Sequence, residues 1–214
     1  VTRQVGADLH CALYGHPTNS KIHEVYFCIV ELDTGAVKRR DGATVANLFP
    51  PAGLPVDVVT QLTLAYDPPS GHNIRLFDIS PTDEIAICEW TTDDDASYKY
   101  LYWDGSTWIK RDMASTGSVL GYTPAIHYHG GASFPDPGGG GTLYLSREQG
   151  GVWSIERWTT ADHGLTWNNQ VVVRSETEKL VRPYCPLDGS GVVFTRLYSY
   201  AGYRSFNADI VWRP

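Results

Sequence analysis

Two histidines stand two residues apart in the stretch Thr123–Gly131, which reads TPAIHYHGG. On a strand, His127 and His129 would point to the same side, because side chains alternate along a strand. An imidazole titrates near neutral pH, so either histidine is suited to give or take a proton. The Gly130–Gly131 pair lets a backbone or a ligand approach closely, which favours His129 as the catalytic residue of the two. The alternative is a structural histidine that donates a hydrogen bond to a carbonyl.

A second group combines cationic and phenolic side chains. Arg182 precedes Pro183, which predicts an extended backbone, and Tyr184 then falls on the same face as Arg182. A guanidinium holds a carboxylate through two parallel hydrogen bonds, and a neighbouring phenol is suited to proton transfer. Both are predicted to bind substrate, with an ion pair between neighbouring sheets as the alternative for Arg182. Arg147 is a further substrate-binding candidate, although the adjacent Glu148 predicts an ion pair across strands.

The segment near the C-terminus is rich in tyrosine and interrupted by glycine, as a sugar-binding loop would be. Tyr198 and Tyr203 are predicted to take part in catalysis, and Arg204 to bind substrate. Most tryptophans are instead expected to pack in the core, namely Trp90, Trp103, Trp108, Trp153, Trp158 and Trp212. The acidic run at 93–95 is expected to form a solvated turn, with weak calcium binding as the alternative.

The composition of the chain excludes several classes of protein. The chain has 214 residues, a formal net charge of −7 and 42% hydrophobic residues. No run approaches the roughly 18 apolar residues of a membrane span, and the cationic residues are scattered, so no nucleic-acid partner is expected. The 21 glycines and 13 prolines leave little room for long helices. The four widely spaced cysteines are expected to be buried free thiols, disulfides being the alternative. Because the only methionine is Met113, Val1 is not a translational start, and a trimmed, processed or partial chain is expected.

Short strand-like runs separated by turn signals recur along the chain. They fall into blade-like units near residues 7–47, 60–113, 120–175 and 180–214, of which the first is the least regular. Repeated units of four short antiparallel strands are typical of propeller blades. We therefore predict an all-β fold, a β-propeller of four-stranded antiparallel blades forming a single domain or propeller portion over 1–214. It is either a small propeller of about four blades or the C-terminal part of a larger one, with a β-sandwich as the alternative.

Residues 160–167 read TADHGLTW and match the Asp-box turn of sialidase-type blades. In such a turn Asp162 accepts backbone amide hydrogens, Gly164 supplies a positive φ, and Trp167 packs back between strands of its own blade. All three are predicted to be structural, because this turn lies at the outer end of a blade, away from the central axis. The segment Asp104–Trp108, which reads DGSTW, is similar to a shortened version of it.

The order of the motifs HYHGGASF, GTLYLSREQGGVWSIERWTTADHGLTW, LVRPYCP and YSYAGYRSFNADIVW resembles the BNR-4 group of Asp-box repeat proteins, over roughly residues 60–214. The chain is most similar to the C-terminal half of these domains, which form a seven-bladed propeller in longer members. Some relatives are ulvan lyases, which cleave a uronate-containing polysaccharide by β-elimination. The resemblance implies a secreted, periplasmic or cell-surface protein that acts on polysaccharide.

Lyase chemistry on a uronate divides three roles among the candidate residues. A cation neutralises the carboxylate, a base removes the adjacent proton, and an acid protonates the leaving oxygen. The candidates are, for proton transfer, His127, His129, Tyr198 and Tyr203, and, for the carboxylate, Arg182 and Arg204. The alternatives are a non-catalytic glycan-binding or adhesion module and a sialidase-like glycoside hydrolase.

The same reasoning sets expectations for cofactors and partners. No cofactor is expected to be required, with a structural calcium or zinc ion as the alternative. The expected partner is a polysaccharide or glycan, and either a partner chain or missing blades would complete the propeller.

Overall fold

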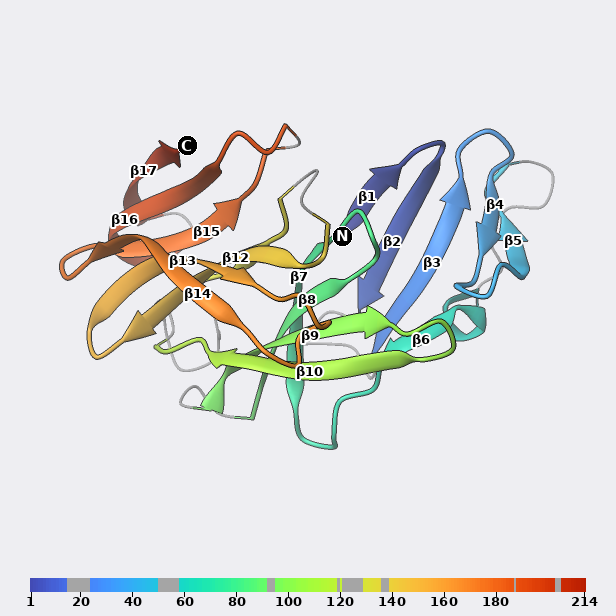
Figure 1. Ribbon diagram of the computed structural model, residues 1–214, viewed down its shortest axis with the longest axis horizontal. Helices are drawn as coiled ribbons and strands as arrows, with labels where there is room; N and C mark the ends of the chain where they lie inside the picture. Colours follow the sequence, from blue (N-terminus) through green and yellow to red (C-terminus); the bar gives the residue numbers. More distant parts are fainter. Residues whose placement is uncertain are drawn as a thin grey trace.

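The computed structural model describes residues 1–14, 24–49, 58–91, 95–118, 120, 129–135, 139–186, 188–202 and 205–214. These residues form β-strands and one short 3-10 helix, η1 (Val58–Gln61), which confirms the predicted all-β class. The strands make four antiparallel sheets that follow one another along the chain (Figure 1). No helix in this described part is long and apolar enough to cross a membrane.

The first sheet has six strands and extends further along the sequence than predicted. Its strands are β1 (Thr2–Val5), β2 (Asp8–Tyr14), β3 (Val25–Glu31), β4 (Ala36–Lys38), β5 (Thr44–Asn47) and β6 (Thr63–Tyr66). The sequence places β6 in the unit 60–113, but β6 pairs with β3. The reason is packing, since Ala65 joins Val25 and Phe27 in one buried cluster.

The other three sheets are simpler. The second is β7 (Asn73–Ile79), β8 (Ile85–Trp90), β9 (Ser97–Trp103) and β10 (Trp108–Ser115). The third is β11 (Ala132–Ser133), β12 (Thr142–Gln149), β13 (Val152–Thr159) and β14 (Asn168–Ser175). The fourth has β15 (Lys179–Tyr184), β16 (Val192–Gly202) and β17 (Ser205–Arg213). The second and third sheets therefore have the four antiparallel strands that the sequence predicts.

Local turn chemistry sets the hairpin between β9 and β10. Trp103 pairs with Trp108, and the carboxylate of Asp104 accepts the amide hydrogens of Ser106 and Thr107, each at 2.8 Å. Gly105 has a φ of 104°, which a residue with a Cβ adopts only under strain. The segment that resembles a shortened Asp-box turn in the sequence therefore forms the turn of a hairpin between β9 and β10.

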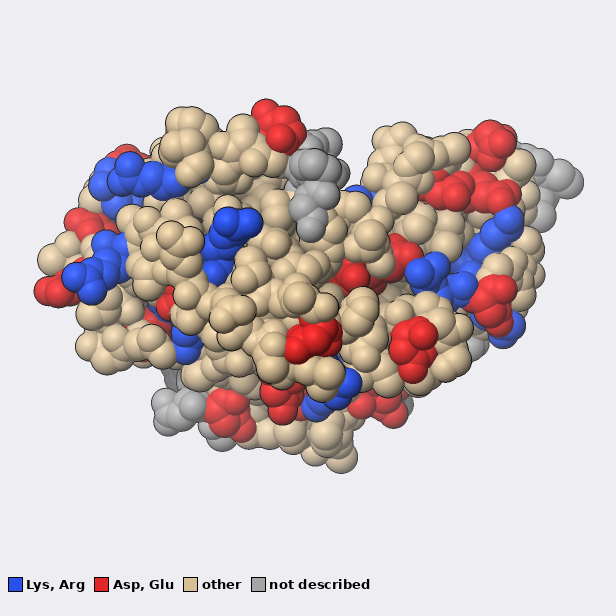
Figure 2. Space-filling model, viewed as in Figure 1, with Lys and Arg blue, Asp and Glu red and all other residues tan. Residues whose placement is uncertain are grey.

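Buried apolar side chains fill the spaces between successive sheets. One cluster, which includes Phe27 and Ile87, joins the first and second sheets. A second, which includes Tyr98 and Leu145, joins the second and third, and a third cluster around Phe194 joins the last two. The sheets therefore pack face to face in series, and Figure 1 shows them following one another around an arc. Figure 2 shows a notch between the part built from β1–β5 and the part built from the third and fourth sheets.

The sequence predicts the burial of the cysteines correctly, but not the burial of every tryptophan. Trp212 was expected in the core but is 53% exposed, because it lies on the side of β17 that no other sheet covers, beside Ile210, which is 73% exposed. All four cysteines are buried and free, as predicted. Within the described ranges, no three His, Cys, Asp or Glu side chains are grouped so that they could hold a metal ion.

Candidate functional site

A cavity of about 660 Å³ opens where the inner strands of the four sheets approach one another. Strand β7 contacts β1 and β11, and β11 in turn contacts β15. The lining residues come from all four sheets and are Val1, Thr2, Arg3, Gln4, Gly6, Phe77, Asp78, Ala132, Ser133, Pro183, Tyr184 and Cys185. We call this cavity the axial pocket, because it lies at the shared inner edge of the sheets.

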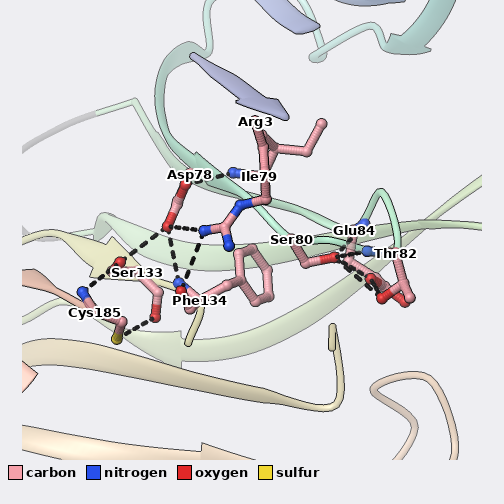
Figure 3. A network of polar contacts seen from close by, with 9 residues as sticks. All are labelled: Arg3, Asp78, Ile79, Ser80, Thr82, Glu84, Ser133, Phe134 and Cys185. Atoms are coloured by element: carbon pink, nitrogen blue, oxygen red, sulfur yellow. Dashed lines mark hydrogen bonds and ion pairs between the residues drawn. The ribbon is translucent and has the colours of Figure 1, made fainter. Parts of the chain in front are cut away.

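Asp78 connects three of the sheets at the wall of this pocket (Figure 3). Its Oδ2 accepts hydrogen bonds from Ser133 Oγ and from the Phe134 amide, each at 2.9 Å, and lies 3.5 Å from the Arg3 guanidinium. Its Oδ1 accepts the amide hydrogen of Ile79 at 2.8 Å. The Arg3 guanidinium also donates to the Phe134 carbonyl at 3.3 Å. Hydrogen bonds to a charged group are each worth about 1.5–3 kcal/mol, so Asp78 holds the inner strands of three sheets together.

The fourth sheet joins the same network through Cys185. Its amide donates to Ser133 Oγ at 3.1 Å, and its thiol donates to the Ser133 carbonyl at 3.7 Å. Burial raises the pKa of the Cys185 thiol to about 12, so this cysteine stays protonated and is a poor nucleophile. Its role in the pocket is therefore structural.

The turn that follows β7 is also held by side chains (Figure 3). The hydroxyls of Ser80 and Thr82 both donate to Glu84 Oε2, the second at 2.6 Å. Thr82 Oγ1 in turn accepts the Gly140 amide at 2.9 Å, which ties this turn to the third sheet. The position of Asp78 at the end of β7 is thus fixed from both sides.

Tyr184 and the buried Pro183 line the axial pocket, and Arg182 immediately precedes them on β15. Tyr184 lines the pocket and is 59% exposed, and Arg182 is also exposed. The predicted extended backbone at Arg182 is wrong, because its φ is 57°, in the left-handed region. The pairing of β15 with β16 shifts between Val181 and Tyr184, and the backbone at Arg182 turns to accommodate this bulge. Both side chains nevertheless emerge on the exposed surface.

The backbone next to His129 is hydrogen-bonded to that of Arg182, but the two side chains differ in their exposure to solvent. The Arg182 amide donates to the carbonyl of the neighbouring Gly130 at 2.7 Å. The His129 ring itself is only 1% exposed, with Nδ1 at 3.2 Å from Thr116 Oγ1 and its centroid 5.2 Å from that of Trp90. The structure therefore brings the two backbones together, with the His129 side chain buried and the Arg182 side chain exposed.

Arg147, a predicted substrate-binding residue, is used inside the protein. Its guanidinium donates to Glu156 at 2.9 Å and to the Ser115 carbonyl at 3.0 Å, and it lies over the ring of Trp158. Ser115 belongs to the second sheet, so Arg147 connects the second and third sheets. In this structure its guanidinium is thus occupied by contacts inside the protein.

The remaining predicted catalytic residues are divided between described and undescribed parts of the chain. Tyr198 is exposed on β16, where its hydroxyl donates to Asp209 at 2.5 Å, and Asp209 also accepts a hydrogen bond from Arg196. The hydrogen bond to Asp209 raises the pKa of Tyr198 and makes it a weaker acid. The other predictions in this group lie outside the described residues, namely His127, Tyr203 and Arg204.

The turn at 160–167 has the local geometry that the sequence suggests. Asp162 accepts hydrogen bonds from the Thr166 amide and hydroxyl at 2.9 and 2.6 Å, and these bonds hold the pKa of Asp162 at about 2. Gly164 has a φ of 82°. Trp167 packs against Trp158 of its own sheet and, edge to face at 5.3 Å, against Tyr100 of the preceding sheet. The tryptophan thus joins two sheets rather than packing within one.

Sequence reasoning missed Arg3, Asp78 and Ser133. Asp78 carried a usable signal, since it interrupts the apolar run NIRLFDIS, and a carboxylate within a buried strand requires partners. Arg3 and Ser133 carried none, because they meet Asp78 only when three distant strands come together.

Comparison with known proteins supports the fold. No protein-family model and no curated protein matches the chain. Among solved structures, the chain is similar to a PL25 ulvan lyase bound to -[GlcA(1-4)Rha3S]-, with a TM-score of 0.66 and 13% identity over 99% of this chain and 50% of that one. A second PL25 ulvan lyase structure gives a TM-score of 0.65 and 14% identity, with the same coverage.

The chain thus spans about half the length of the solved structures it matches. At this level of identity the likeness shows the fold alone, a β-propeller-like arrangement of antiparallel sheets. The axial pocket has an exposed phenol, that of Tyr184, and a wall of fixed polar groups, and the exposed Arg182 precedes this phenol by two residues. Such a set is suited to hold a carboxylate and to move a proton beside it.

Proposed function

We propose that this protein is carbohydrate-active and that it cleaves a uronate-containing polysaccharide by β-elimination. The observation that carries the proposal is the exposure of Tyr184 in the axial pocket and of Arg182 two residues before it on β15. The fold adds support, because a similar solved structure is an ulvan lyase bound to a ligand that contains GlcA. A uronate of that kind carries the carboxylate for which an exposed arginine is suited.

In this proposal Arg182 binds the uronate carboxylate through its guanidinium. Neutralising that charge makes the proton on the adjacent carbon easier to remove. Tyr184 carries one of the two proton transfers, either from that carbon or to the departing glycosidic oxygen. The second transfer falls to His127 or Tyr203, and Arg204 adds a second cation for the substrate. Tyr198, whose hydroxyl donates to Asp209, lies on β16 a few residues before Tyr203 and Arg204 in the sequence.

The test is turnover of a panel of uronate polysaccharides, measured by the ultraviolet absorbance of the unsaturated product. We expect Tyr184→Phe to lower kcat, and Arg182→Ala to raise KM and lower kcat, with circular dichroism unchanged. Arg174→Ala is the matched control, because Arg174 is exposed on β14, outside the axial pocket. Loss of turnover in the control, or full activity in both site variants, would overturn the proposal.

A second candidate function is a glycan-binding module without catalysis. It is favoured by one observation, the burial of His129, which the sequence favours as the catalytic histidine. In that case polysaccharide would bind to the wild-type chain in isothermal titration, Arg182→Ala would weaken binding, and no unsaturated product would form.

A further inference from the structure

Two free cysteines face each other across neighbouring strands of the first sheet. Cys11 on β2 and Cys28 on β3 are partners in an antiparallel register that runs without interruption from Asp8 to Tyr14. Both are buried, at 6% and 4% exposure, and both belong to one apolar cluster. Residues in register on adjacent strands project to the same side of the sheet, so the two thiols lie side by side.

The hydrogen-bond pattern fixes which kind of pair they form. The Ala12 amide donates to the Val1 carbonyl at 2.9 Å, so the peptide groups of Ala12 face β1. Successive residues of a strand direct their peptide groups to opposite neighbours, so those of Cys11 face β3 and its partner Cys28. Such a hydrogen-bonded pair has a Cα–Cα distance of about 5.5 Å. A disulfide spans Cα–Cα distances of about 4.4–6.8 Å, so the separation expected of this pair lies within the range that a disulfide can bridge.

The two thiols already interact in the free state. A hydrogen bond from the Cys28 thiol lowers the pKa of Cys11, while the same contact together with burial raises that of Cys28. The thiolate is the nucleophilic form of cysteine, so Cys11 is the better nucleophile and Cys28 the resolving partner.

We propose that Cys11 and Cys28 are a reversible redox site that closes to a cross-strand disulfide. With a low-molecular-weight disulfide as oxidant, Cys11 attacks one sulfur and releases the first thiol. Cys28 then attacks Cys11 Sγ and releases the second thiol. Two protein thiols and one oxidant disulfide become one protein disulfide and two small thiols, so protons and electrons balance.

The same geometry makes this bond easy to reduce. Directly opposed Cβ atoms lie about 4.5–5.5 Å apart, whereas a relaxed disulfide prefers about 3.8 Å. Closing the bond draws the strands together, and a disulfide formed under such constraint is more readily reduced than a relaxed one. The oxidised form joins β2 to β3 and restricts the unfolded chain between them, so it is expected to unfold at a higher temperature.

The experiment counts free thiols by mass spectrometry. Folded protein is treated with oxidised glutathione, then denatured and alkylated with iodoacetamide. Of the four cysteines, we expect all to be alkylated before oxidation and only two afterwards, with a linked peptide that contains Cys11 and Cys28. Dithiothreitol should restore full alkylation and lower the Tm again.

Matched controls lie in the other sheets. Burial raises the pKa of Cys88 and of Cys185 above the ordinary range, so both should remain reduced. The variant C88A/C185A should still lose both of its remaining thiols, and Cys28→Ser should hold glutathione on Cys11 as a stable adduct. Four alkylated cysteines after oxidation, or a link through Cys88 or Cys185, would overturn the proposal. The count of alkylated cysteines in the wild-type protein tests the proposal even if a variant fails to fold.

Discussion

Glu156 and Arg147 show what a single buried ion pair does in this molecule. Glu156 is 2% exposed and accepts hydrogen bonds from Arg147, Ser154 and Trp158 at 2.8–2.9 Å. Burial by itself would raise the pKa of this carboxyl, but the three hydrogen bonds and the charge of Arg147 outweigh it and lower the pKa. The folded protein therefore holds Glu156 in its charged form more strongly than the unfolded chain does.

We expect Glu156→Gln to lower the free energy of unfolding by roughly 3 kcal/mol at pH 7, because it leaves a buried guanidinium without its counter-charge. Since the folded pKa is lowered, this stability is present above the unfolded value of about 4.3 and is lost as the pH falls below it. Urea denaturation at several pH values should show the two proteins converging in acid. As a control, R147M/E156L should be less destabilised than E156Q. An equal loss at all pH values would contradict the prediction.

Arg182 combines an exposed side chain with a left-handed backbone, which favours glycine. A residue with a Cβ pays about 1–2 kcal/mol in this conformation. Arg182→Gly should therefore be more stable than Arg182→Ala by about 1 kcal/mol in urea denaturation, while both lose the proposed turnover. Greater stability of the alanine variant would show that the backbone there is not strained.

Among the elements, the second and third sheets approach closely at Gly117, just after β10. A Cβ at this position would lie 1.9 Å from the Glu148 carbonyl oxygen of β12, and the φ of Gly117 is 74°. The Glu148 amide also donates to the Thr116 carbonyl at 3.0 Å, so the two backbones cannot separate without losing that bond.

Gly117→Ala should therefore destabilise the protein far more than Gly105→Ala. Gly105 also has a positive φ, but nothing lies within 4 Å of its missing Cβ, so its substitution costs only the backbone conformation, about 1 kcal/mol. We expect Gly117→Ala to cost several times as much by urea denaturation. Equal losses in the two variants would mean that the sheets can move apart at no cost.

The elements also show why some of the structure was predictable from the sequence. The hairpin at Asp104 and the turn at Asp162 depend on residues a few positions apart, so their chemistry is visible in the sequence. The bulge at Arg182 and the pairing of β6 with β3 depend on partners far along the chain. The rule for residues before proline favours an extended backbone, but the register of β15 with β16 overrides it.

The same distinction applies to the candidate site. Tyr184 and Arg182 are both exposed, although the extended backbone from which the sequence predicted a shared face is wrong at Arg182. The Arg3–Asp78–Ser133 network could not, because residues on three different sheets form it. His129 satisfied every local criterion for a functional residue, yet neighbouring elements enclose it.

At the scale of the molecule, two exposed features of the described residues bear on ligand binding. One is the axial pocket, and the other is the uncovered side of the fourth sheet, where Ile210 and Trp212 are exposed. On the face that Figure 2 shows, acidic and basic side chains are interspersed rather than gathered in a basic patch. With a net charge of −7, the protein as a whole repels the polyanion that the proposed function requires it to bind.

Because the net charge repels the polysaccharide while Arg182 attracts its carboxylates, we predict that the affinity for polysaccharide rises as salt is added. The Debye length falls from about 30 Å at 0.01 M to about 8 Å at 0.15 M ionic strength. Salt in this range screens the repulsion between distant acidic residues and the polysaccharide, whereas the direct contact between Arg182 and a carboxylate is far shorter and persists. The apparent affinity for a uronate polysaccharide in isothermal titration should therefore rise a few-fold across the range, and Arg182→Ala should bind weakly throughout. A steady loss of affinity from the lowest salt upward would instead show that many basic residues bind the polysaccharide, and would contradict a site in which Arg182 and Arg204 supply the cations.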